Sequence, residues 1–162
     1  MRDRVLWSFL VLGLLGAGSA SAGNSKPAGP PPVGPGQARG KLTAKGQSYA
    51  LTHAAAFTDQ KDNTLVLLVT DEPVPAAKWT SQSDIFPYRM DHQFHGVAFR
   101  FDKAGTLTGA DVYAGRFPTG TLGYFTVALT GKTRAGTARS TDVAAKAEEP
   151  VSLNVTFNAG TR

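Results

Sequence analysis

Apolar and polar residues alternate with a period of two along most of the chain after residue 40. Between residues 151 and 158, four apolar side chains alternate with four polar ones, which is typical of a strand that buries one face. The segments 97–102 and 124–130 show the same alternation. Helical periodicity is nearly absent, and short helices are expected only at 76–81 and 142–148. The pattern restricts the chain to an all-β fold.

The remaining strands follow from composition and turn signals. Residues 64–70 are apolar on both faces, which predicts a central strand covered on both sides. In the preceding strand, 47–58, the residues predicted to share one face are Tyr49, Leu51, His53, Ala55 and Phe57. Further strands are expected at 40–44, 107–114 and 133–141, with turns at 45–46, 102–105 and 130–132. About eight strands predict a single β-sandwich, immunoglobulin-like or similar, with a small β-barrel as the alternative.

The N-terminus has the features of a secretory signal. Two arginines precede the apolar stretch 5–17, and Ala20 and Ala22 have the small side chains that signal peptidase requires. We therefore expect a signal peptide at 1–22, cleaved after Ala22. The apolar stretch is shorter than the roughly 20 residues of a membrane span, although an uncleaved anchor stays an alternative. The mature chain is expected in the bacterial periplasm or outside the cell, without stable membrane insertion.

Residues 23–39 are rich in Pro and Gly, and Val33 is their only large apolar residue. Such a segment buries too little surface to offset its ordering entropy, so we expect a disordered linker here and one β-domain at 40–162. The chain contains no cysteine, which excludes disulfides, thiolate metal ligands and a cysteine-linked lipid.

Charge and motifs exclude several functions. The chain carries 17 basic and 12 acidic residues, a net charge of +5, but the basic residues are scattered rather than clustered as in nucleic-acid binders. We expect no nucleic-acid partner. The chain has no nucleophile motif of the G-x-S-x-G type and no phosphate-binding loop. It is therefore expected to be non-enzymatic, without catalytic residues.

Histidines suggest a metal site as the alternative function. His92 and His95 are three residues apart and Asp91 precedes them, so on a helical turn their side chains would point toward one ion. His53 is a further candidate ligand. Copper or zinc is the metal expected for such ligands. The other interpretation is that these histidines form local hydrogen bonds, in a loop or in the core.

The long stretch 74–96 contains the candidate binding residues. Trp79, Tyr88 and Arg89 are residue types that dominate protein interfaces. They predict a binding or interaction module for a protein or an envelope component. The alternative is that the aromatic residues of this stretch pack inward and cap the end of the β-domain.

Three segments of the sequence are similar to those of a known group of proteins. Residues 40–75 begin GKLTAKGQSYALTHAAAFTD and end NTLVLLVTDEPVP, and the segments FDKAGTLTG at 101–109 and VSLNVTFNA at 151–159 follow. In these segments the chain resembles a group of small secreted bacterial β-domain proteins of uncharacterised function. The resemblance implies an exported β-domain and carries over no catalytic residue.

Overall fold

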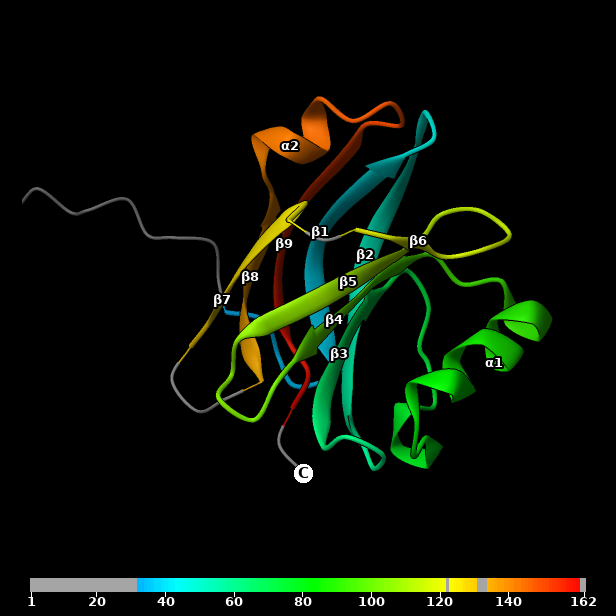
Figure 1. Ribbon diagram of the computed structural model, residues 1–162, viewed down its shortest axis with the longest axis vertical. Coiled ribbons are helices and arrows are strands. Elements are labelled where there is room, and N and C mark those ends of the chain that lie inside the picture. The colour runs from blue at the N-terminus through cyan, green and yellow to red at the C-terminus, as the bar shows by residue number, and fades with distance from the viewer. Residues whose placement is uncertain (1–31, 122, 131–133, 161–162) are drawn as a thin grey trace, which may run out of the picture. The chain divides into compact units, whose positions relative to one another are not determined.

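Nine strands form one antiparallel sheet in the computed structural model, which describes residues 32–121, 123–130 and 134–160 (Figure 1). The strands are β1 (Gln37–Ala44), β2 (Gln47–Asp59), β3 (Thr64–Thr70), β4 (Gly96–Phe101), β5 (Leu107–Tyr113), β6 (Thr119–Gly120), β7 (Phe125–Leu129), β8 (Ala135–Ser140) and β9 (Val151–Asn158). Their order across the sheet is β6-β5-β4-β3-β2-β1-β9-β8-β7. The predicted all-β class is confirmed.

The sheet curls into a half-barrel rather than splitting into two packed sheets. β1 pairs with β2 on one side and with β9 on the other, so it joins the two halves that a sandwich would keep apart. β1 also has a register irregularity between Gln37 and Gly40, and such bulges bend a strand. A Cβ atom at Gly40 would lie 2.3 Å from the carbonyl oxygen of Asn154 in β9, so this bend requires glycine. The arrangement follows the barrel alternative.

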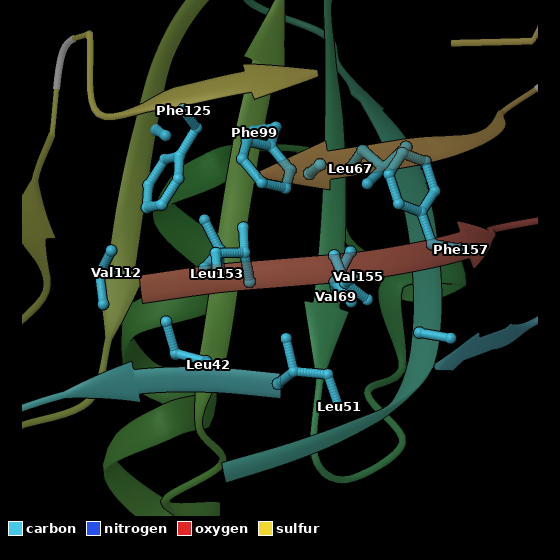
Figure 2. Close-up of a cluster of buried hydrophobic side chains, with 14 of the residues drawn as sticks. Leu42, Leu51, Leu67, Val69, Phe99, Val112, Phe125, Leu153, Val155 and Phe157 are labelled. Carbon is cyan, nitrogen blue, oxygen red and sulfur yellow. The ribbon is translucent and has the colours of Figure 1, made fainter. Parts of the chain in front are cut away.

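The main core fills the inner, concave side of the curl (Figure 2). Its larger buried side chains are Leu42, Leu51, Leu67, Val69, Phe99, Val112, Phe125, Leu153, Val155 and Phe157. The rings of Phe99 in β4 and Phe125 in β7 meet edge to face, with centroids 5.7 Å apart. This contact joins strands from the two halves of the sheet through side chains, because β4 and β7 are not paired through their backbones.

Most predicted strands are confirmed to within a few residues. β3 and β9 have the predicted bounds or nearly so, and β3 is buried on both faces. Lys45 and Gly46 form the predicted turn, with φ angles of 52° and 72°. β1 begins at Gln37, earlier than the domain start predicted at residue 40. β6 was not expected, and the turn predicted at 130–132 lies largely outside the described residues.

The single face predicted for β2 is wrong, because the strand changes face near its middle. Leu51 and Ala54 both belong to the inner core although they are three residues apart. Phe57, in contrast, is buried on the outer side of the sheet. The change coincides with the register irregularity between β1 and β2, where Gln37 pairs with His53 but Gly40 pairs with Leu51. The two strands differ by one residue between these pairs, and a one-residue difference reverses the alternation of side chains.

The helices differ most from the prediction. The 3-10 helix η1 (Ala76–Lys78) and the helix α2 (Asp142–Ala145) lie within the two segments predicted to be helical, but both are shorter. The stretch predicted as an irregular loop also contains η2 (Gln82–Asp84) and α1 (Ile85–His92). α1 has no apolar periodicity because its two buried residues are Ile85 and Arg89.

The predicted signal peptide and residues 23–31 of the predicted linker lie outside the described residues. Within the described ranges, none of the helices is both long and apolar enough to cross a membrane.

Candidate functional site

The connection between β3 and β4, residues 71–95, folds over the outer face of the sheet. Figure 1 shows α1 on this outer side. A second cluster of buried side chains joins the connection to the sheet: Phe57, Val66, Leu68, Ala76, Trp79, Ile85, Phe94, Ala98 and Tyr113. Val66 and Leu68 alternate along β3 with Leu67 and Val69 of the inner core, so the two clusters occupy opposite faces.

Asp59, at the end of β2, holds the middle of this connection in place. Its carboxylate accepts hydrogen bonds from the backbone N–H of Gln82 at 2.7 Å, from that of Lys61 at 3.0 Å and from the Ser81 hydroxyl at 3.3 Å. The hydrogen bonds from Gln82 and Lys61 lower the pKa of Asp59. The buried carboxylate therefore fixes the start of the helical part of the connection.

Asp71 and His95 close the two ends of the connection. The backbone N–H of His95 donates to Asp71 Oδ1 at 2.7 Å, and His95 Nδ1 lies 2.8 Å from Asp71 Oδ2. The Asp71 N–H donates to the His95 carbonyl at 3.0 Å. Tyr49 stacks on the His95 ring with centroids 4.1 Å apart. The position and orientation of the imidazole are therefore set from three directions.

A pocket of about 460 Å³ opens between α1 and the connection from β5 to β6. Its lining consists of Arg89, Met90, Gln93, His95, Gly115 and Arg116. None of these six residues is acidic. The last turn of α1 contributes Arg89, the segment between α1 and β4 contributes His95, and the connection after β5 contributes Arg116.

Arg89 forms the innermost part of this site and is only 5% exposed. Its Nε donates to the carbonyl of Phe94 at 3.1 Å, and its Nη1 donates to the carbonyl of Arg116 at 2.9 Å. The guanidinium carbon lies 6.0 Å from the ring centre of Phe94 and 5.7 Å from that of Tyr113. Two carbonyl groups and two rings therefore fix the guanidinium plane.

The charge of Arg89 is not matched by an acidic partner. In the described ranges, the ion pairs are Lys45–Glu149, His95–Asp71 and Arg100–Asp111. Burial lowers the pKa of Arg89, while Asp71 acts in the opposite direction at longer range. A guanidinium stays protonated at any physiological pH. Burial also raises the pKa of Tyr113, so this neighbour stays an uncharged phenol and does not neutralise Arg89.

Of the predicted metal ligands, His53 and His95 both contact Asp71, His53 through the Asp71 carbonyl oxygen at 3.3 Å and His95 through the carboxylate. His92 is exposed at the end of α1 and stacks on Tyr88, with centroids 4.2 Å apart. Asp91 is exposed, and His53 Nδ1 lies 2.9 Å from the Thr52 hydroxyl. No group of three or more potential ligands occurs within the parts of the chain that the structure describes. His95 is the only one of the four candidates that lines the pocket.

The predicted binding residues have different environments. Trp79 is buried, with its ring 5.7 Å from Phe57, and Tyr88 is half-buried against Trp79. These two contacts agree with inward packing of the aromatic residues. Arg89 is buried as well, but it faces the pocket. Met90 on α1 is the large apolar side chain that is exposed and lines the pocket.

Gln93, Gly115 and Arg116 were not among the site residues predicted from the sequence. Gly115 and Arg116 are at least 20 residues from His95 along the chain and are brought to it by the pairing of β4 with β5. One local signal was present, because Ile85 and Arg89 have the i, i+4 spacing of one helix face. A buried arginine on the same helix face as a buried isoleucine would have indicated this site.

Comparison with known proteins adds no further assignment: no protein-family model, no curated protein and no solved structure matches the chain. The resemblance to small secreted bacterial β-domains stays a prediction.

Proposed function

We propose that this chain is an exported, non-enzymatic binding domain whose ligand site is the pocket between α1 and residues 115–116. The observation that carries the proposal is Arg89, a buried, oriented and unpaired charge at the inner end of a cavity. Binding sites combine a concave surface with a few fixed polar groups, and this pocket has both.

Binding is favoured over catalysis by the surroundings of His95. The Asp71–His95 pair has the arrangement that orients a catalytic base in many hydrolases. Among the described residues, however, the Asp71 carboxylate is the only hydrogen-bonding partner of the His95 ring. The other residues that line the pocket have no hydroxyl group. The pair therefore has no nucleophile to activate and fits better with holding the ligand.

The proposal is tested by blocking the pocket from its rim. Met90 is 42% exposed and lines the pocket, so Met90→Trp would fill the cavity with little effect on the core. Val143 on α2 is 59% exposed and does not line the pocket, which makes Val143→Trp the matched control. A set of small acids, phosphates, sugars, amines and neutral amino acids is titrated into the mature chain and followed by amide NMR shifts.

The proposal predicts that a compound which shifts the amides of residues 89–95 and 115–116 binds the Val143→Trp variant as it binds the parent. It predicts weaker binding to Met90→Trp. The proposal would be contradicted if every compound that binds did so equally well to Met90→Trp, or shifted only amides remote from the pocket.

A further inference from the structure

Two arginines near the 71–95 connection differ in how their charges are balanced. Arg100 in β4 forms an ion pair with Asp111 in β5, and Asp111 also accepts a hydrogen bond from Gln82. Arg89 is more deeply buried but has no carboxylate within ion-pair distance in the described part of the chain. A buried charge is costly unless it is paired. An anion from solution would supply the counter-charge that the protein itself does not.

The hydrogen bonds of Arg89 leave one side of its guanidinium available. Nε and Nη1 donate to the two carbonyl groups, whereas Nη2 has no partner among the described residues. No buried side-chain nitrogen within the described ranges lacks a partner, so Nη2 must reach solvent. Arg89 lines the pocket, so we take the pocket as the solvent-accessible space that Nη2 reaches. The second N–H of Nη1 and both N–H groups of Nη2 form the fork that binds two oxygens of a carboxylate or phosphate.

The other groups that line the pocket strengthen its preference for negative charge. Arg116 contributes a second guanidinium, and His95 adds positive charge whenever it is protonated. Asp71 is the carboxylate behind His95, and both of its oxygens are engaged by that residue. Tyr49 stacks on the His95 ring, and the Tyr113 ring lies against the Arg89 guanidinium. The charged groups that reach the cavity itself are therefore all basic.

The size of the pocket indicates an organic anion rather than an inorganic ion. Its volume of about 460 Å³ lies in the range of small-molecule sites and greatly exceeds a single phosphate or sulfate. The side chain of Met90 and the backbone of Gly115 provide a less polar wall for the rest of the ligand.

We infer that the pocket binds a small organic molecule through a carboxylate or phosphate group that lies against Arg89, with Arg116 as a supporting cation and the His95 imidazole in the same lining. This inference rests on the proposed function and adds the chemical class of the ligand. It concerns a small molecule, since the fork of Arg89 lies at the inner end of a cavity and not on the open surface.

The test uses probes of similar shape that differ in charge, added to the mature chain at low ionic strength. Benzoate and phenyl phosphate carry the two anionic groups, benzamide is a neutral match for benzoate, and inorganic phosphate is the anion without its organic part. Amide NMR titration measures the dissociation constants. We expect benzoate or phenyl phosphate to shift residues 89–95 and 115–116, benzamide to bind at least about tenfold more weakly, and inorganic phosphate to bind more weakly than phenyl phosphate.

Variants test the roles of single residues. Arg116→Gln should weaken binding of the anionic probe about threefold to tenfold, whereas Lys103→Gln, in the exposed turn between β4 and β5, should leave it unchanged. Arg89→Lys keeps the charge but not the fork and should weaken binding about tenfold. If Arg89→Lys does not fold, the comparison of benzoate with benzamide still tests the inference, because it needs no variant.

The outcomes separate the two proposals. Equal binding of benzoate and benzamide at these amides would overturn the anion inference and leave the pocket as the binding site. The same holds if only neutral or cationic compounds bind there. Equal binding of inorganic phosphate and phenyl phosphate would overturn the inference that the ligand is an organic anion. If no compound of any class shifts these amides, both proposals fail.

Discussion

The inner and outer faces of the sheet bury their residues in different ways. The inner face contains an almost purely apolar core to which nearly every strand contributes. On the outer face, the covering segment and the sheet also bury Asp59, Thr70 and Arg89. The polar groups of Asp59 and Thr70 are hydrogen-bonded within the chain, whereas the charge of Arg89 has no acidic partner within ion-pair distance in the described residues. The difference shows that buried Asp59 and Thr70 on the outer face are matched by partners within the chain, whereas Arg89 is the residue that we propose binds a ligand.

The comparison predicts that the inner face is the more sensitive to loss of volume. Phe99 is fully buried and its ring contacts Phe125 across the curl. Phe99→Ala should lower the free energy of unfolding by about 3–5 kcal/mol, measured by urea denaturation of the chain from residue 23 onward. The exposed Phe117→Ala, at 60% exposure, is the control and should change stability by less than about 0.5 kcal/mol. Similar effects of the two variants would contradict the assignment of the inner face as the main core.

The paired arginine of the outer face should depend on its partner. Asp111→Asn removes the carboxylate that binds Arg100 and accepts from Gln82. Because Arg100 is then left partly buried without its counter-charge, the free energy of unfolding should fall by about 2–3 kcal/mol. Thermal or urea unfolding measures the loss. A change of less than about 0.5 kcal/mol would mean that this pair behaves like an exposed surface ion pair.

The stabilisation by Asp59, which holds the 71–95 connection in place, should depend on pH in the acid range. The pKa of Asp59 is lowered from the usual 3.8 by the hydrogen bonds from Gln82 and Lys61, so the ionised form stabilises the fold. That stabilisation is present above pH 3.8 and is lost as the pH falls through the lowered folded-state value.

Asp59→Asn is the matching variant. It should lower stability at neutral pH by about 1–2 kcal/mol and should lose less stability than the parent between pH 4 and pH 2. Urea titrations at each pH measure both effects. Parallel pH profiles of parent and variant would show that Asp59 does not contribute to acid unfolding.

The smallest effect on stability is expected for the unpaired arginine. Arg89→Met gives up two hydrogen bonds to carbonyl groups but also removes an unmatched buried charge. Because these contributions oppose each other, the free energy of unfolding should change by less than about 1 kcal/mol. Anion binding should nevertheless be lost. A loss of stability as large as that of Asp111→Asn would indicate a structural rather than a ligand-binding role for Arg89.

The inner face could be predicted from the sequence, whereas only Arg89 and His95 of the residues that line the pocket were among the predicted site residues. Alternation at 151–158 and 97–102 identifies β9 and β4 because each buried position is apolar. The same pattern does not predict α1, because Arg89 occupies a buried position where an apolar residue is expected. Arg116 escapes it because strand pairing, and not sequence distance, brings it to His95. The face change of β2 depends on a bulge, which needs the register with β1 to be seen.

The central claim is that Arg89 carries an unmatched charge whose free donors face the pocket. The most direct test is side-chain NMR of its guanidinium nitrogens during a benzoate titration of the chain from residue 23 onward, at constant ionic strength. We predict that the Nη signals of Arg89 shift and exchange more slowly with solvent as benzoate binds, while those of Arg100, already paired with Asp111, do not move. Unchanged Arg89 signals at benzoate concentrations that saturate the amide shifts would contradict the claim.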